Sequence, residues 1–138
     1  MAIQSFINQK TSIPADVLSL TGPEVLARAR HFHSTIPGYQ PTPLVFLDHL
    51  ARRLGISSLL VKDESHRFGL NAFKSLGGSF AIARTLAKKL GWPEDEVTFD
   101  ALMSPEVKEK LGTLTFVTAT DGNHGRGVAW AASLLGHK

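Results

Sequence analysis

The sequence predicts an α/β fold with parallel strands flanked by helices. The order strand, loop, helix occurs twice: an apolar run over 56–63 precedes a helix from Lys74, and a β-branched and aromatic run over 114–118 precedes a helix from about Asn123. Parallel strands covered by helices are buried on both faces, and their ligands bind beyond the carboxyl ends of the strands. Two strands cannot complete such a sheet, so the sequence is expected to be cut short at Lys138.

Composition limits the classes of protein. The chain has 138 residues, of which 43% are hydrophobic and 20% charged, enough for one globular domain with a core. The net charge of +3 is spread along the chain, which argues against nucleic-acid binding. Without a signal peptide or a long apolar run, no membrane association is expected. The absence of cysteine excludes disulfides and permits a reducing compartment, so the predicted location is cytoplasmic.

The first third of the chain predicts two helices. Thr21 and Glu24 form a capping box, and the apolar spacing that follows predicts a helix over 22–33. His31 and His33 face different ways on that helix, so they are expected to be solvated, and no metal site is predicted. After a proline-rich connection, a second helix is expected over 45–54, with Gly55 as its stop.

A long helix is predicted over 74–90, and Gly91 ends it. Gly77 and Gly78 leave its first turns almost bare, at a cost of about 1 kcal/mol each relative to alanine. The usual compensation is close packing of a bulky group, either a cofactor or another backbone. Two short helical segments are expected next, over 99–103 and from Ser104 to Gly112.

Lys74 is the first candidate for chemistry. It starts a helix among apolar neighbours, and both the helix N-terminus and the apolar surroundings favour a neutral amine. A neutral amine is what a Schiff-base lysine requires. The alternative is a solvated surface lysine that happens to start a helix.

The loop from Thr120 to Gly125 is the second candidate. The N–H groups of a helix N-terminus can hold an anion, and glycines let the backbone approach a ligand closely. Asn123 offers an amide and Asp121 an acid. The alternative is an ordinary tight turn with a helix cap, for which Asp-Gly-Asn is also suited.

Taken together, these segments resemble the fold-type II pyridoxal-phosphate enzymes. Three elements match in order: Pro41-Thr42-Pro43-Leu44, the Phe73-Lys74 pair, and Gly122-Asn123-His124-Gly125. Within that family, the amino-acid sequence over 62–65, 67–74 and 120–130 is most similar to that of the diaminopropionate ammonia-lyases. The resemblance covers about the N-terminal third of such an enzyme, from about Ala27 onward.

The resemblance implies roles for individual residues. Lys74 would bind pyridoxal 5′-phosphate covalently and later move protons, and Phe73 would pack against the cofactor ring. Asn123 would hydrogen-bond the 3′-oxygen of the cofactor, with Gly122 and His124 also in contact with it. Asp121 would be an acid/base group that lets the enzyme accept both isomers of 2,3-diaminopropionate, which is eliminated to pyruvate and ammonia.

The resemblance also implies an incomplete chain. Residues 1–112 would belong to the larger cofactor-binding domain and 113–138 would begin the smaller one, with the glycine-rich phosphate loop downstream. The full-length enzyme is expected to be a homodimer, and this chain alone to be inactive. Two alternatives stay open: a serine or threonine dehydratase, against which Asp121 argues, and a catalytically dead truncated chain that pairs with another subunit.

Overall fold

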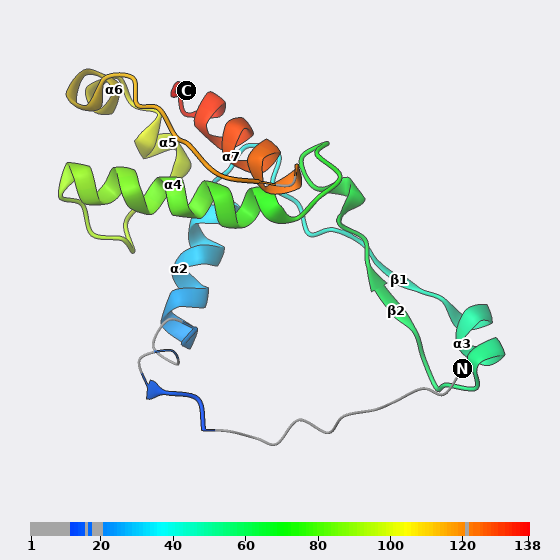
Figure 1. Ribbon diagram of the computed structural model, residues 1–138. Helices are drawn as coiled ribbons and strands as arrows, with labels where there is room; N and C mark the ends of the chain where they lie inside the picture. The colour runs from blue at the N-terminus through cyan, green and yellow to red at the C-terminus, as the bar shows by residue number, and fades with distance from the viewer. Residues whose placement is uncertain (1–11, 16, 18–20, 121) are drawn as a thin grey trace.

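The computed structural model describes residues 12–15, 17, 21–120 and 122–138. A long central helix, α4, carries other helices on its sides, and a two-stranded arm extends away from them (Figure 1). The elements are α2 (Pro23–Ser34), β1 (Leu44–Phe46), α3 (Asp48–Leu54), β2 (Leu60–Lys62), the 3₁₀ helix η1 (Glu64–His66), α4 (Lys74–Leu90), α5 (Phe99–Leu102), α6 (Pro105–Leu111) and α7 (Asn123–Leu134).

Helix α4 forms the centre of the hydrophobic core. Its predicted bounds are confirmed, and Gly91 ends it in the left-handed conformation with φ 74°. Ile82, Leu86 and Leu90 point inward from this helix, where α2, α5, α6, α7 and the segments between the helices contribute further buried apolar side chains. The core therefore consists of helices packed around α4, and no buried sheet contributes to it within the described residues.

The predicted helices outside the arm are also confirmed, with small shifts at their ends. Helix α2 begins at Pro23 with Gly22 as its N-cap, one residue later than the expected cap at Thr21. Ser104 caps α6 by accepting a hydrogen bond from the Val107 N–H, and Gly112 follows that helix. In the part of the chain that the structure describes, no helix is both long and apolar enough to cross a membrane.

The arm corrects two predictions. Residues 44–46, expected to start a helix or to precede one, form strand β1, and only 48–54 are helical. The run over 56–63, expected to be a buried parallel strand, contributes the short β2, which pairs antiparallel with β1 and is exposed at every position. Periodicity alone does not distinguish a short apolar strand from a helix segment, and burial depends on elements that lie elsewhere in the fold.

The second predicted strand, 114–118, is also absent as a strand. The segment runs as an open stretch between α6 and α7 (Figure 1). Its backbone nevertheless makes two long-range bonds: the Lys138 N–H donates to the Leu114 carbonyl over 2.8 Å, and the Phe116 N–H donates to the Lys138 carbonyl over 2.6 Å. A strand is defined by its ladder, so a segment with one paired residue remains irregular despite its strand-like composition.

Candidate active site

The two predicted chemical loops lie at the same end of two adjacent helices. Lys74 opens α4 and Asn123 opens α7, and both N-termini lie on the side of the molecule from which the arm extends (Figure 1). The helices touch through Gly127: an ideal Cβ at this position would lie 2.9 Å from the Cα of Ser75 and 3.0 Å from the carbonyl carbon of Lys74. A side chain at Gly127 would therefore separate the two loops.

Gly78 repeats this contact farther along α4. A Cβ there would lie 3.4 Å from Gly127 and Val128 of α7, whereas Gly77 has nothing within 4 Å. Of the two compensations expected for the bare glycine turns, another backbone is the one found at Gly78. The buried hydroxyl of Ser75, at the same crossing, has no hydrogen-bond partner among the described residues.

Lys74 is placed as the sequence predicts. It is the first residue of α4, half-buried, and its ammonium forms no hydrogen bond or ion pair with any described residue. Phe73, the N-cap, has 59% of its surface exposed. A partly accessible lysine therefore follows directly after an exposed aromatic residue at the start of α4.

The second loop is organised by a residue that the sequence reasoning did not assign. The Thr120 hydroxyl accepts hydrogen bonds from the N–H groups of Gly122, over 3.0 Å, and Gly125, over 2.8 Å. An ideal Cβ on Gly125 would lie 2.4 Å from the methyl group of Thr120, so a side chain at position 125 would collide with it. Thr120 thus fixes the first turn of α7. In the sequence, this role is indicated by a hydroxyl residue shortly before the glycine-rich start of a helix.

The other predicted residues of this loop follow Thr120. Gly122 is the N-cap with φ 136° and ψ −78°, a conformation that favours glycine. Asn123 is exposed and His124 half-buried on the first turn of α7. Asp121, the predicted second catalytic residue, lies outside the described residues.

Behind Lys74, α4 is held by a histidine that was expected to be solvated. His33 is half-buried, and its Nε2 donates to the Leu76 carbonyl over 2.8 Å. Its ring packs against Tyr39 and Phe80. Burial lowers the pKa of His33, the hydrogen bond to Leu76 opposes that shift, and the nearby Arg67 guanidinium adds to it. The solvated assignment is wrong for His33 because tertiary packing closes over this face of α2.

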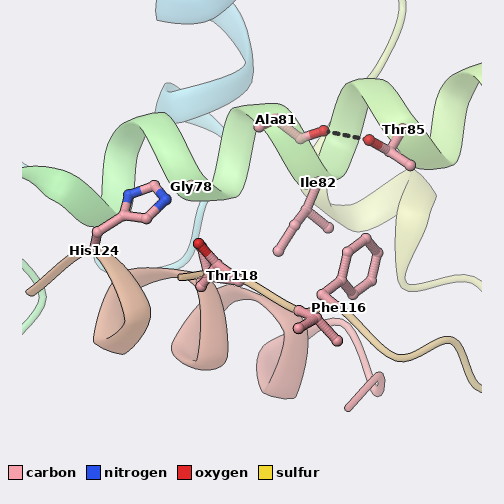
Figure 2. A pocket seen from close by; sticks show the side chains of 9 residues that line it. Gly78, Ala81, Ile82, Thr85, Phe116, Thr118 and His124 are labelled. Carbon is pink, nitrogen blue, oxygen red and sulfur yellow. Dashed lines mark hydrogen bonds between the residues drawn. The ribbon is translucent and has the colours of Figure 1, made fainter. Parts of the chain in front are cut away.

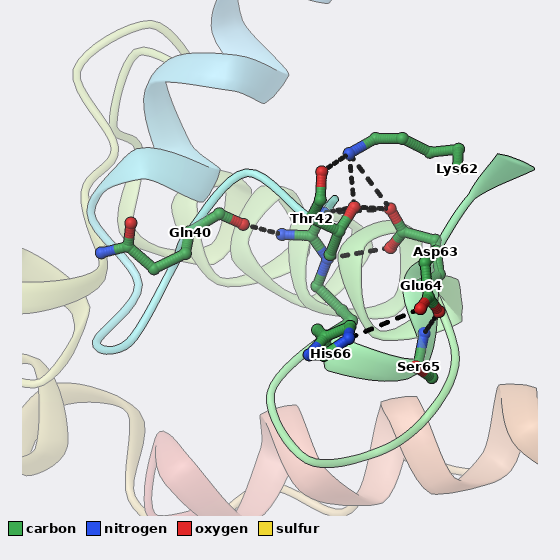
Figure 3. Close-up of polar contacts among 8 residues, drawn as sticks. Gln40, Thr42, Lys62, Asp63, Glu64, Ser65 and His66 are labelled. Carbon is green, nitrogen blue, oxygen red and sulfur yellow. Dashed lines mark hydrogen bonds and ion pairs between the residues drawn. The ribbon is translucent and has the colours of Figure 1, made fainter. Parts of the chain in front are cut away.

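A polar network anchors the loop that leads to Lys74. The Arg67 guanidinium, 5% exposed, forms two hydrogen bonds with the Glu64 carboxylate and one with the Gln40 carbonyl (Figure 3). Thr42 donates to Glu64 over 2.5 Å, and the Lys62 ammonium lies 4.0 Å from the same carboxylate oxygen. The Arg67 hydrogen bonds are the main reason that the pKa of Glu64 is lowered.

This network joins two segments that carry the family resemblance, Pro41–Leu44 and residues 62–67. Hydrogen bonds connect Thr42 of the first segment to Lys62, Glu64 and Arg67 of the second. Phe68 then carries the connection to α7, because its ring stacks on Trp130 at a centroid distance of 4.6 Å. Phe68 and Asn71 both have positive φ, 51° and 52°, an uncommon conformation for residues other than glycine. The contact of Phe68 with Trp130 thus accompanies an uncommon backbone conformation in the segment before Lys74.

Comparison with known proteins identifies what the chain resembles. Residues 35–138 match the model of the family described as pyridoxal-phosphate dependent enzymes. A diaminopropionate ammonia-lyase of Salmonella typhimurium is 58% identical over 117 residues, which are 85% of this chain and 28% of that protein.

Solved structures agree with that similarity. The apo form of the Escherichia coli diaminopropionate ammonia-lyase matches with a TM-score of 0.77 at 50% identity, over 86% of this chain and 31% of that one. The complex of the same enzyme with D-serine has the same TM-score and identity, over 86% of this chain and 30% of that one. The chain thus spans less than a third of the length of the relatives it matches.

Proposed function

This chain belongs to the family of pyridoxal-phosphate-dependent enzymes, and we propose that it supplies the lysine and asparagine loops of a diaminopropionate ammonia-lyase. The carrying observation is the contact between Gly127 and Ser75, which sets the helix starts at Lys74 and Asn123 next to each other. The reaction would be the α,β-elimination of 2,3-diaminopropionate to pyruvate and ammonia.

The groups present at this end of the molecule suit the cofactor. Lys74 offers an amine without an ionic partner in the described chain, and Phe73 an uncovered aromatic ring. The Ser75 hydroxyl beside them is buried and unpartnered, and two helix N-termini favour a ligand with negative charge. This donor set fits an anionic aromatic aldehyde.

Bound pyridoxal phosphate supplies an electron sink that stabilises the carbanion left when the α-proton of the amino acid departs. The side chains of this chain would position the cofactor and the substrate and would transfer protons to and from the substrate. Lys74 would hold the cofactor through its Nζ and would exchange protons with the substrate. Phe73 would pack against the cofactor ring and Asn123 would hydrogen-bond its 3′-oxygen, with Gly122 and His124 also in contact with the cofactor.

Asp121 is proposed as a second acid/base group. A carboxylate on this loop would reach the face of the substrate opposite Lys74, so an enzyme with both groups can remove the α-proton of either isomer. Asp121→Asn in a full-length relative should reduce turnover of D-2,3-diaminopropionate more than turnover of the L-isomer. Equal losses for both isomers would leave Asp121 as a helix cap only.

We also propose the larger organisation of the enzyme. Residues 1–112 would belong to the large domain and 113–138 would begin the smaller one; within the second part, a backbone hydrogen bond joins Leu114 and Lys138 on the two sides of α7. The full-length enzyme would be a cytoplasmic homodimer. The exposed apolar residues of the arm, such as Phe46 at 61%, support a further covering surface.

Covalent labelling tests the role of Lys74. The chain is incubated with pyridoxal phosphate, reduced with borohydride and mapped by peptide mass spectrometry. Label is expected on Lys74 ahead of Lys62, which serves as an internal control because its ammonium is hydrogen-bonded to Thr42. Label that favours Lys62 or spreads evenly over the lysines would contradict the assignment.

The chain alone is proposed to be inactive. It spans 28% of the length of the Salmonella lyase, and orientation of the reacting groups can contribute roughly 7–11 kcal/mol to catalysis. Pyruvate release from diaminopropionate by the purified chain with added cofactor should lie far below that of a full-length relative. Turnover within about tenfold of the relative would overturn this proposal.

A further inference from the structure

We infer that Phe68 and Trp130 are positioning residues for Lys74: the stack of their rings holds a strained turn that fixes the chain on the N-terminal side of the lysine. The inference rests on the proposed role of Lys74 in holding the cofactor. It adds two residues that lie outside both candidate catalytic loops.

The segment before Lys74 contains a turn that is unfavourable for an aromatic residue. The Leu70 N–H donates to the Arg67 carbonyl over 2.9 Å, and the two residues between them, Phe68 and Gly69, have φ of 51° and 69°. Positive φ at both central positions characterises a type I′ turn, which prefers asparagine, aspartate and glycine there. A bulky residue at such a φ is an outlier that costs free energy. Phe68 therefore weakens this turn unless its ring gains a contact elsewhere.

The ring of Phe68 makes that contact with α7. Its centroid lies 4.6 Å from the centroid of Trp130, and the two ring planes are inclined by 29°. The Tyr39 ring lies 6.4 Å from Phe68, and the Arg67 guanidinium lies 5.8 Å from it. Stacked aromatic pairs contribute stability beyond the area they bury, so the stack offsets the cost of the turn. One side chain thus links the shape of the loop to the position of α7.

Helix α7 contacts the chain on both sides of Lys74. Trp130 stacks on Phe68, which precedes the lysine, and Gly127 stands against Ser75, which follows it directly. Gly127 and Trp130 are an i, i+3 pair, so they lie on one face of α7. These two contacts form a clamp around Lys74. Since a single helix makes both of them and also carries the second candidate loop at its start, the clamp sets the lysine relative to that loop.

The opposite flank of α7 lies outside this clamp and provides a control. A groove of about 210 Å³ separates α4 from residues 116–118, with His124 among its lining residues (Figure 2). Val128 also lines the groove, and it is turned roughly 200° around the helix from Trp130. Phe116 borders the same groove. Loss of the Phe116 ring therefore removes an aromatic side chain near α7 without touching the clamp.

Selective labelling measures the position of the lysine. The chain and its variants are incubated with pyridoxal phosphate, reduced with borohydride and mapped, and the label on Lys74 is divided by the label on Lys62. Trp130→Leu should lower this ratio about fivefold, a factor that corresponds to the loss of one aromatic pair. Trp130→Phe keeps a ring against Phe68 and should restore most of the ratio. Phe116→Leu should leave the ratio within about twofold of that of the unaltered chain, because distant sites act independently.

Phe68→Asn separates positioning from stability. Asparagine suits the turn and relieves its strain, but it offers no ring to Trp130. The free energy of unfolding should therefore fall less than in Trp130→Leu, whereas the labelling ratio should fall as far. Labelling is carried out on variants whose circular dichroism shows full helix content. If the ratio instead followed the stability of each variant, the stack would be a structural contact only, and the inference would be wrong.

Hydrogen exchange without cofactor separates this inference from the proposed function. If Lys74 took no more label than Lys62 in the unaltered chain, the proposed role of Lys74 would fail, and the clamp would be judged by exchange alone. The Leu70 amide closes the turn, so it should exchange about fivefold faster in Trp130→Leu and return toward its original rate in Trp130→Phe. An exchange rate within about twofold of that of the unaltered chain, or an equal effect of Phe116→Leu, would overturn the inference.

Discussion

Gly127 of α7 stands against the backbone of Ser75 of α4, so close that an ideal Cβ on the glycine would lie 2.9 Å from both the Cα and the N of the serine. Ser75 is the neighbour of Lys74, and Gly127 lies one helical turn beyond Asn123. The absence of a side chain at one position thus sets the spacing of the two candidate catalytic loops. The site depends on backbone contact between helices, which also makes it open to direct test.

Alanine substitutions of three glycines should separate close packing from helix propensity. Gly127→Ala should destabilise the chain by about 2 kcal/mol or more, since a methyl group would overlap backbone that cannot move without shifting α4. Gly77→Ala, with nothing within 4 Å, should instead stabilise it by about 0.5–1 kcal/mol. Gly78→Ala should lie between them. Urea unfolding monitored by circular dichroism measures all three.

The order of these three variants is the decisive result. If Gly127→Ala were as stable as Gly77→Ala, the helices would not be in the contact described. Far-ultraviolet spectra of the folded variants serve as the control that helix content is retained.

Thr120 should act through its hydroxyl as a cap and through its methyl group as a filler. Thr120→Val keeps the methyl group against Gly125 but leaves two N–H groups without their acceptor, and should cost about 1–2 kcal/mol. Thr120→Ser keeps the acceptor and removes the methyl group, so its cost should be smaller. Thermal unfolding of the two variants makes the comparison; a larger loss for serine than for valine would reject the capping role.

Arg67 and Arg84 offer a matched pair of ion pairs that differ in burial. Each guanidinium forms two hydrogen bonds with one carboxylate, Arg67 with Glu64 at 5% side-chain exposure and Arg84 with Glu94 at 51%. Arg67→Met should cost about 3 kcal/mol because it removes the main ionic partner of a largely buried carboxylate, whereas Arg84→Met should cost under about 1 kcal/mol. Denaturant midpoints provide the measurement. Similar losses at the two sites would show that the Arg67 network is no more than a surface contact.

Two histidines should make the chain less stable as the pH falls. Burial is the main cause that lowers the pKa of both His33 and His137 below 6.5. The unfolded chain then binds protons that the folded chain does not, so stability is complete above the unfolded pKa and declines as the pH falls through it toward the folded pKa. The decline should stop once the pH is below the folded pKa values.

Replacement of both rings isolates this effect. His137 accepts the Leu114 N–H at Nδ1, a role that asparagine can take, and His33 donates from Nε2, which glutamine can reproduce. His33→Gln with His137→Asn should flatten the dependence of unfolding free energy on pH between about 7.5 and 5.5. A slope as steep as that of the unaltered chain would assign the pH dependence to other groups.

The sequence by itself determined the helices and the family. Helix α4 was predicted from Lys74 to Leu90 because its apolar spacing, a loop before it and Gly91 after it all act within the segment. The motifs around Lys74 and Asn123 likewise depend on short runs of residues. Local chemistry of this kind is readable without knowing what lies next to it.

Tertiary structure alone decided the strands and the contacts that set the site. Strand pairing requires a neighbour: residues 44–46 and 60–62 form an exposed antiparallel pair, and, in the described part of the chain, the backbone of 114–118 forms long-range backbone hydrogen bonds with Lys138 alone. The close approach of Gly127 to Ser75, the capping by Thr120 and the burial of His33 join residues distant in sequence or depend on loop geometry. No periodicity within a segment encodes them, because their free energy arises only when the segments meet.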